Sequence, residues 1–444
     1  MFLALGILLF SGYPVGAVLG GVGLAFGFLG VYLDIFVPIE FFNLVGRIWS
    51  GIADNLVLVA IPMFIFMGTM LEKSGVAADL LHCLQVVLRR VPGGLALSVT
   101  VMGTIMAATT GIIGASVVMM TLMALPVMLQ QRYDTKLATG TIAASGTLGI
   151  LIPPSIMLVI MADLLGRSVG TLFVAAVLPG LLLAGAYALY ILGLCRLKPA
   201  LAPKLPDDIG PQALPEFIVL ILRGLVPPVF LILLVLGSIV FGWATPTEAA
   251  GVGAGGAILL ALINGRLNLR TLNEVVERSA LTGAMLFFLF IGATAFSYVF
   301  RSLGGDDLII EFVEGMGLGP WGILFVLMAI VFLLGFFFDW IEITLIVLPV
   351  FAPIIELLDF GDHVAQKDIV YWFAILIAVN LQTSFLTPPF GFALFYMKGV
   401  APKEVKIQQI YRGIIPFVML QLVGLGFVMA FPEIAMWVPN KLLD

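Results

Sequence analysis

Apolar segments long enough to cross a membrane recur along the whole chain, and this feature restricts its fold most strongly. A helix needs about 20 apolar residues to cross the ~30 Å hydrocarbon core of a bilayer. Only 11% of the 444 residues are charged, against roughly 25% in a soluble protein. We therefore predict an all-α polytopic membrane protein. The predicted spans are 14–33, 50–72, 137–163, 171–195, 217–242, 247–264, 281–300, 369–397 and 412–437.

Two further apolar segments, 95–130 and 321–358, are too long for one crossing and too short for two with a loop. Non-helical backbone at membrane depth is stable only where protein or a wet cavity surrounds it. We therefore predict two re-entrant helical hairpins, each entering and leaving the membrane on one side. Small or polar residues near their centres are Thr110, Gly111, Gly114 and Ser116 in the first, and Gly335 and Asp339 in the second.

Landmarks that recur in register indicate an internal repeat. The pairs are Gly68 and Gly292, 224 residues apart, Pro126 and Pro349, 223 apart, and the double prolines 153–154 and 388–389, 235 apart. Each repeat thus contains a hairpin and then a helix broken at a double proline, 137–163 or 369–397. The expected division is scaffold in 1–72, first-repeat transport elements in 73–200, a central loop and scaffold helices in 201–280, and second-repeat transport elements in 281–440.

The distribution of lysine and arginine predicts the orientation. If both hairpins are re-entrant, sixteen of the 21 cationic residues lie on one side of the membrane. Loops rich in lysine and arginine remain in the cytoplasm. The two repeats then have inverted topology, an architecture typical of secondary transporters with a central binding site.

Both double prolines lie within apolar spans and should unwind them, because proline lacks an amide donor and disfavours helix before it. Carbonyl groups freed in this way need a partner, and a hard cation such as Na⁺ binds backbone and hydroxyl oxygens. Either the breaks bind a coupling ion, or they are kinks whose backbone groups are satisfied by neighbouring helices. Polar side chains beside them are Ser145, Thr147 and Ser155 at the first break, and Asn380, Thr383, Ser384 and Thr387 at the second.

Three charged residues in or beside apolar segments are candidates for function. Asp339 lies within the second hairpin, where an acid is costly and therefore a functional candidate. Glu342 follows it and can instead face water at the hairpin tip. Arg301 ends an apolar span, so it is either an interfacial anchor or a fork that binds a carboxylate.

Enzymatic and ATP-driven functions have little support. The two cysteines and two histidines form no metal-binding motif, and no GxxxxGK[ST] loop occurs. We expect no cofactor and no nucleic-acid partner. Residues 245–248 predict a capping box at a helix start. Residues 1–13 form only half a span, which is either a short arm or the end of a longer first helix.

The motifs IPMFIFMGTMLEKSG, GTLGILIPPS, GWATPTEAAGVGA, GFFFDWIEITLIVLP and TPPFG follow one another in this order. This pattern, over essentially the whole chain, resembles the large membrane subunit, M or DctM type, of tripartite ATP-independent periplasmic (TRAP) transporters. The resemblance implies a bacterial inner-membrane permease that works with a small four-helix membrane subunit and a periplasmic solute-binding protein. It also implies Na⁺-coupled import by an elevator motion of the hairpin-bearing domain.

The resemblance further implies two ion sites. The first would involve Thr110, with Gly114 and Ser116 nearby, and the backbone around Gly149, Ile152 and Pro154; the second would involve Gly335, Asp339, Ser384 and Thr387. Arg301 resembles the family's substrate arginine, and Asn380 is a further substrate candidate. The chain departs from the family at 110–113, where members often read SGSS, and at Ser384, where glycine is common.

These observations predict a permease that imports a small organic anion, with a carboxylate as the expected class and Na⁺ as the coupling ion. A stand-alone ion-coupled carboxylate symporter or exchanger, without a binding protein, is the main alternative. A passive channel is a more remote one. Co-purification with a four-helix partner and uptake against a gradient would separate these functions.

Overall fold

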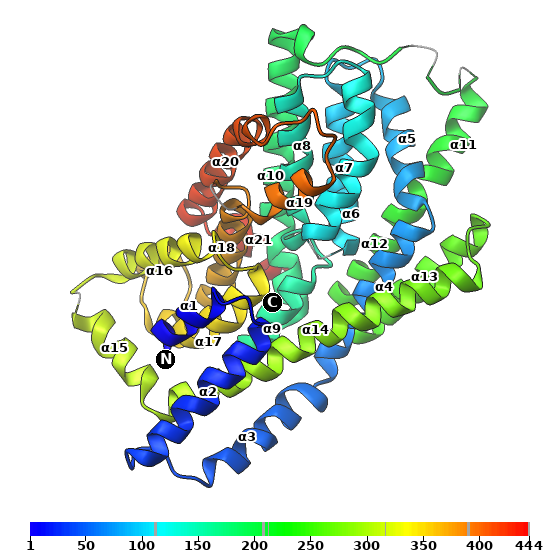
Figure 1. The fold of residues 1–444 in the computed structure, drawn as a ribbon. Helices are drawn as coiled ribbons and strands as arrows, with labels where there is room; N and C mark the ends of the chain where they lie inside the picture. The colour runs from blue at the N-terminus through cyan, green and yellow to red at the C-terminus, as the bar shows by residue number, and fades with distance from the viewer. Residues whose placement is uncertain (111–112, 207–208, 212, 316, 389–390, 443–444) are drawn as a thin grey trace.

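The computed structural model describes residues 1–444 except 111–112, 207–208, 212, 316, 389–390 and 443–444, and the backbone alone of 107–110, 310 and 312–314. The described residues form helices and connecting loops, with no strand among them. Nine of the described helical segments are long and apolar enough to cross a membrane. The predicted all-α polytopic architecture is therefore confirmed (Figure 1).

The first half of the chain contains the N-terminal helices and the first predicted repeat. Its N-terminal elements are α1 (Phe2–Leu9), α2 (Val15–Tyr32), α3 (Glu40–Ile48), η1 (Trp49–Ala53), η2 (Leu56–Val59), α4 (Ala60–Lys73) and α5 (Val76–Leu88). They are followed by α6 (Gly94–Thr110), α7 (Ile113–Gln130), α8 (Thr135–Thr147), η3 (Leu148–Ile150), α9 (Ile156–Leu164), α10 (Val169–Leu197) and η4 (Pro199–Leu201).

The second half contains the central helices and the second predicted repeat. The central helices are α11 (Leu214–Gly224), α12 (Val226–Val240), α13 (Pro246–Ile263), α14 (Leu269–Ser302) and α15 (Gly305–Gly315). The later elements are α16 (Pro320–Leu334), α17 (Trp340–Leu357), η5 (Gly361–His363), α18 (Ile369–Ser384), α19 (Phe392–Val400), α20 (Ile407–Ala430) and α21 (Glu433–Leu442).

The long helix α14 organises one side of the molecule, where α2 and α4 pack against it (Figure 1). Glycines permit the close approach of α2. A Cβ atom at Gly292 would overlap the carbonyl group of Gly16, and one at Gly23 would lie 3.0 Å from the carbonyl oxygen of Ala295. Small residues allow such close packing where lipid removes the hydrophobic drive for helix association.

Both predicted helix breaks are present. In the first, α8 ends at Thr147, a short 3₁₀ turn follows, and α9 begins at Ile156. In the second, α18 ends at Ser384 and α19 begins at Phe392. Proline has no amide N–H to donate, and it disfavours the helical conformation of the residue before it. These two properties account for both interruptions.

Each predicted hairpin contains two helices, α6 and α7 in the first and α16 and α17 in the second. The arms contain 15 to 18 residues, a length of about 22–27 Å at 1.5 Å per residue. Re-entry from one side, the inverted relation of the repeats and the division at 72, 200 and 280 remain predictions.

The N-terminal segment and the predicted capping box are both described in the structure. Residues 1–13 contain the short helix α1, whose Phe2 ring lies edge-on to those of Phe296 and Phe300 in α14. Thr245 caps α13: its hydroxyl accepts the N–H of Glu248, whose carboxylate accepts the N–H of Thr245.

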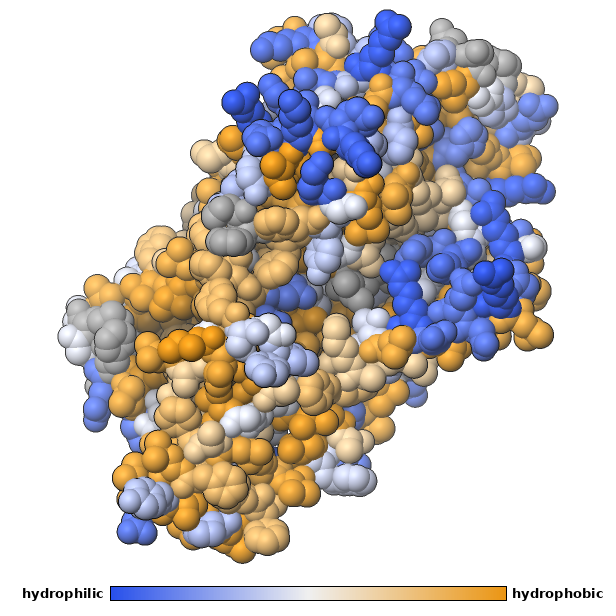
Figure 2. Space-filling view, viewed as in Figure 1, coloured by the Kyte–Doolittle hydropathy of each residue, from blue (hydrophilic) through white to orange (hydrophobic). Residues whose placement is uncertain are grey.

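Hydrophilic residues gather at a few places on the surface. Figure 2 shows them around the α7–α8 end and the α13–α14 turn, while much of the remaining face is hydrophobic. The first of these turns carries Arg132 and Lys136, and the second carries Arg266 and Arg270, all of them exposed. Both turns belong to the side that the charge distribution predicts to be cytoplasmic.

Candidate functional site

The two helix breaks lie beside each other in the interior, although more than 200 residues separate them. The side chain of Gln382 donates from Nε2 to Oγ1 of Thr147 at 3.3 Å. Both side chains are fully buried and precede their respective double prolines. The Oε1 atom of Gln382 is also buried and has no hydrogen-bond partner among the described residues. This contact joins the two predicted repeats at the places where their helices unwind.

At the first break, the carbonyl groups differ in their hydrogen bonds. The oxygen of Leu148 accepts from the backbone, and that of Ile150 accepts the hydroxyl of Ser155 at 2.7 Å. No described residue donates to the carbonyl oxygen of Gly149 or Ile152. The function of this segment in ion binding stays a prediction.

The first hairpin supplies the other residues expected at this site. The side chain of Thr110, like residue 111, lies outside the described part of the chain. Ser116 is buried, and a Cβ atom at Gly114 would lie 3.0 Å from the ring of Tyr396 in α19. The start of α7 is therefore packed against the second half of the second broken helix. Pro154 follows Pro153 in the loop before α9.

At the second break, Gly335 at the end of α16 is packed directly against Ser384. A Cβ atom at Gly335 would overlap the Ser384 hydroxyl. The Ser384 hydroxyl donates to the carbonyl of Leu381 at 2.9 Å, and that of Thr387 donates to the carbonyl of Thr383 at 2.8 Å. The structure therefore brings the hairpin turn to the broken end of α18, with hydroxyl lone pairs still available. Pro389 lies outside the described residues.

Asp339 and Glu342 begin α17, where they form a capping box. The Asp339 side chain accepts the N–H of Trp340 at 2.8 Å, and the Glu342 side chain accepts the N–H of Asp339 at 3.2 Å. Carboxylates stabilise a helix N-terminus by binding its free donors and by opposing its positive dipole end. Both acids therefore have a structural function in addition to any function in ion binding.

The two candidate substrate residues, Asn380 and Arg301, are not brought together. The Asn380 side chain is buried and donates to the carbonyl of Met328 in α16 at 2.7 Å. Arg301 lines a cavity of about 640 Å³ to which Asn380 does not contribute. Asn380 connects α18 to the hairpin, a function that the sequence alone did not reveal.

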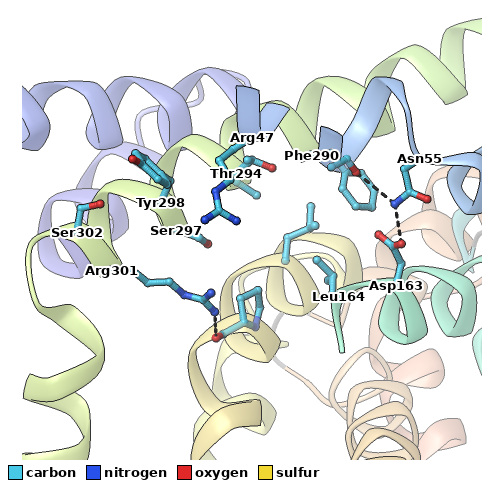
Figure 3. Close-up of a pocket in the computed structure, with 14 residues that line it drawn as sticks. Arg47, Asn55, Asp163, Leu164, Phe290, Thr294, Ser297, Tyr298, Arg301 and Ser302 are labelled. Atoms are coloured by element: carbon cyan, nitrogen blue, oxygen red, sulfur yellow. Dashed lines mark hydrogen bonds between the residues drawn. The ribbon is translucent and has the colours of Figure 1, made fainter. Parts of the chain in front are cut away.

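The cavity lies between α14, the segment around η1, the end of α9 and α17 (Figure 3). Its walls combine charged and polar groups with apolar ones. The lining residues are Arg47, Gly51, Asn55, Asp163, Leu164, Phe290, Ala293, Thr294, Ser297, Tyr298, Arg301, Ser302, Leu345 and Pro349. It thus brings scaffold residues against α9 and α17, which the sequence assigned to the two repeats.

Two arginines face this cavity, and they differ in the hydrogen bonds and ion pairs that they form. Arg301 donates to the carbonyl of Pro349 in α17 at 2.6 Å and lies 3.5 Å from the carboxylate of Asp306. Arg47 is exposed and forms no hydrogen bond or ion pair with any described residue. In Figure 3 its guanidinium group points into the space between α14 and α17. The cavity therefore offers one partly satisfied cation and one unsatisfied cation to an anion.

Sequence reasoning missed Arg47, Asn55 and Asp163. Asn55 donates from Nδ2 to Oδ1 of Asp163 at 2.7 Å, a bond between residues 108 positions apart. In the charge distribution Arg47 is only one of the five remaining cations, on the predicted outer side. Its location on α3, with apolar residues on one face and charged ones on another, was the available signal.

The fold and cavity define a class: a multi-pass membrane protein with two broken helices and a polar, cation-bearing cavity, as in secondary transporters. Residues 2–434 match the family model described as "Tripartite ATP-independent periplasmic transporter, DctM component". The chain belongs to this family of TRAP transporter large permeases. It is accordingly a multi-pass protein of the inner membrane and not an enzyme.

Relatives of several kinds support the assignment. The chain is 31% identical to the C4-dicarboxylate TRAP transporter large permease protein DctM of Pseudomonas aeruginosa, over 88% of each chain. It is 30% identical to the protein of the same name from Rhodobacter capsulatus, over 98% of this chain and 97% of the relative. It is 26% identical to the sialic acid TRAP transporter large permease protein SiaM of Vibrio cholerae, over 98% and 97%.

A solved structure has a related fold. The YdaH transporter of Alcanivorax borkumensis, whose structure is described as having an unusual topology, matches with a TM-score of 0.60 at 17% identity. The match covers 90% of this chain and 88% of that one. At this level of identity the similarity concerns the fold alone.

Proposed function

We propose that the chain imports a small organic anion, most simply a carboxylate, coupled to Na⁺ and by an elevator motion. The observation that carries the proposal is the contact between Gln382 and Thr147, which joins two broken helices in the interior. Beside it, the carbonyl oxygens of Gly149 and Ile152 accept no hydrogen bond from a described residue. Unwound backbone of this kind coordinates coupling ions in secondary transporters.

The cavity supports the choice of an anion. Arg301 and Arg47 present guanidinium groups, which bind carboxylates with paired hydrogen bonds. Arg301 also donates to the carbonyl of Pro349 in α17. An anion that takes over this donor group would loosen the contact between α14 and the second hairpin. Binding would thereby be coupled to the position of the hairpin, since a ligand shifts an equilibrium only by its differential affinity.

The family assignment supports the partners. We propose that the chain acts with a small four-helix membrane subunit and a periplasmic solute-binding protein. Loaded binding protein would deliver the anion from the periplasm, and the Na⁺ gradient would give the transport its direction. Thr110, Gly114, Ser116 and Pro154 would contribute to one ion site, and Gly335, Asp339, Ser384 and Thr387 to the other.

Uptake in proteoliposomes tests this proposal. The chain is reconstituted with its two partners, and uptake of labelled anion is measured in a Na⁺ gradient and in choline. We expect accumulation against a gradient in Na⁺ only. Accumulation without the binding protein would support the stand-alone symporter, and equilibration without accumulation would support a channel.

Arginine variants test the anion site. Arg301→Gln is expected to lower uptake at limiting anion at least about tenfold, a loss of about 1.4 kcal/mol. Arg270→Gln is the matched control, because Arg270 lies at the other end of the same helix, 90% exposed. Equal uptake by both variants would contradict a substrate function for Arg301.

A further inference from the structure

The cavity has two ends of opposite charge. Arg47 and Arg301 supply the cations, and Asp163 supplies the only carboxylate among the lining residues. In Figure 3 Asp163 and Asn55 lie on the side of the cavity opposite Arg301. A ligand that fills the cavity therefore meets arginines at one end and an acid at the other.

The Asp163 carboxylate is held in a fixed orientation. Asn55 accepts the N–H of Val57 through Oδ1 at 3.0 Å, so its amide nitrogen must point the other way. That nitrogen donates to Oδ1 of Asp163 at 2.7 Å and to the carbonyl of Gly51 at 3.3 Å. The second carboxylate oxygen of Asp163 accepts no bond from a described residue. It is a free acceptor at the edge of the cavity.

The hydrogen bond from Asn55 ties Asp163 to a distant segment, but the location of this acid is unfavourable for α9 itself. It lies in the last turn of α9, where its negative charge is repelled by the negative end of the helix dipole. That turn contains no basic residue that would offset the repulsion. No described lysine, arginine or histidine forms an ion pair with it, since the nearby Arg167 pairs with Glu356. An acid that has no ion pair, lies at the negative end of a helix dipole and faces a cavity is a candidate for ligand recognition.

The charges of the cavity limit the charge of the ligand. Arg301 is already shared with Asp306 and with the carbonyl of Pro349, whereas Arg47 is unshared. About one arginine charge is thus left to bind an anion, and one carboxylate, that of Asp163, lies at the far end of the cavity. A single carboxylate with hydrogen-bond donors several atoms away complements this arrangement. A second carboxylate near Asp163 would be repelled and would lose part of its hydration.

We infer that Asp163 is a specificity-determining residue, and that it selects monocarboxylates bearing hydroxyl or ammonium donors over dicarboxylates. The inference rests on the proposed function, because it assumes that this cavity binds the transported anion. Asn55 acts as the positioning residue for the Asp163 carboxylate. Selection of this kind combines an attractive contact for one ligand with a repulsive one for its competitor.

Thermal unfolding of the detergent-purified chain tests the inference. The wild type is titrated in constant Na⁺ with gluconate, a hydroxylated monocarboxylate, and with succinate, a dicarboxylate. A ligand that binds the folded state raises the melting temperature with its concentration. We expect gluconate to act at a concentration at least about tenfold lower than succinate, a difference of about 1.4 kcal/mol. This comparison uses only the wild type, so it remains valid even if a variant fails to fold.

Two variants then assign the selectivity. Asp163→Asn removes the charge and keeps the shape, and it is expected to reduce the preference for gluconate at least about fivefold. Asp54→Asn is the control, because Asp54 is an exposed acid beside Asn55 that does not line the cavity. This variant should keep the wild-type preference.

The outcomes separate the inference from the proposed function. Equal or tighter binding of succinate to the wild type, or an unchanged preference in Asp163→Asn, would overturn the inference and leave the anion site intact. If neither carboxylate raises the melting temperature of the wild type, the anion site itself is contradicted, and the inference fails with it.

Discussion

The contact between Gly335 and Ser384 gives the sharpest test of the ion site. A Cβ atom at Gly335 would lie 2.5 Å from the Cβ atom of Ser384, whereas ordinary contact begins at 3.4 Å. Even after the Ser384 hydroxyl, which would lie closer still, rotates aside, Gly335→Ala must move the hairpin turn and α18 apart by about 0.9 Å. Such overpacking costs about 1–3 kcal/mol. If the hairpin must close on α18 to enclose the ion, this cost lowers Na⁺ affinity by about 5- to 150-fold.

The assay is the melting temperature of the purified chain in NaCl and in choline chloride. For the wild type we expect a Na⁺-dependent increase that follows the fractional saturation of the site. Gly335→Ala should shift the midpoint of that increase to higher Na⁺ by the factor above. Adding Ser384→Gly removes both overlapping atoms, so the double variant should have the same Na⁺ midpoint as Ser384→Gly alone. A double-mutant cycle then gives the coupling energy.

The matched control is Gly185→Ala. Gly185 lies within α10, and a Cβ atom there meets nothing within 4 Å. Alanine at this position should leave the Na⁺ midpoint unchanged and stabilise the helix by up to about 1 kcal/mol. The reasoning is refuted if Gly335→Ala keeps the wild-type Na⁺ midpoint, or if it still shifts the midpoint when residue 384 is already glycine.

Two further variants test the stability of other parts of the fold. Thr245→Ala removes the capping hydroxyl of α13 and should cost about 1 kcal/mol; Thr245→Ser should retain the wild-type melting temperature, and equal melting of both would contradict the cap. Tyr187→Phe leaves the buried Gln421 amide without its 2.7 Å partner and should cost about 1–3 kcal/mol. Replacing Gln421 by leucine as well should recover stability, and failure to recover would show that the cost arises from packing.

Much of the fold follows from local chemistry that the sequence contains directly. Apolar length predicts the spans because each must bury its backbone hydrogen bonds within lipid. The breaks at 148–155 and 385–391 follow from proline, which lacks a donor wherever it is placed. The cap at Thr245 follows from a four-residue pattern. Each of these predictions depends on residues that are close together in the chain.

The candidate site was only partly predictable for the opposite reason. From the sequence, Asn380 is one of the polar side chains beside the second break and a substrate candidate. Its amide is instead used by Met328, 52 residues away. Asp339 was predicted for its cost in the membrane, and the cap that it forms on α17 also gives it a structural reason to be there. A side chain's type predicts that it needs a partner, but not which partner it finds.

The sequence by itself determined that this protein lies in a membrane, where its helices are interrupted, and to which family it is similar. Only the tertiary structure decided that Gln382 reaches Thr147, and that Arg47 and Asp163 lie at one cavity. The physical reason is that span length and proline act through neighbours in the chain. Cavities and paired polar groups, by contrast, arise where helices distant in sequence pack together.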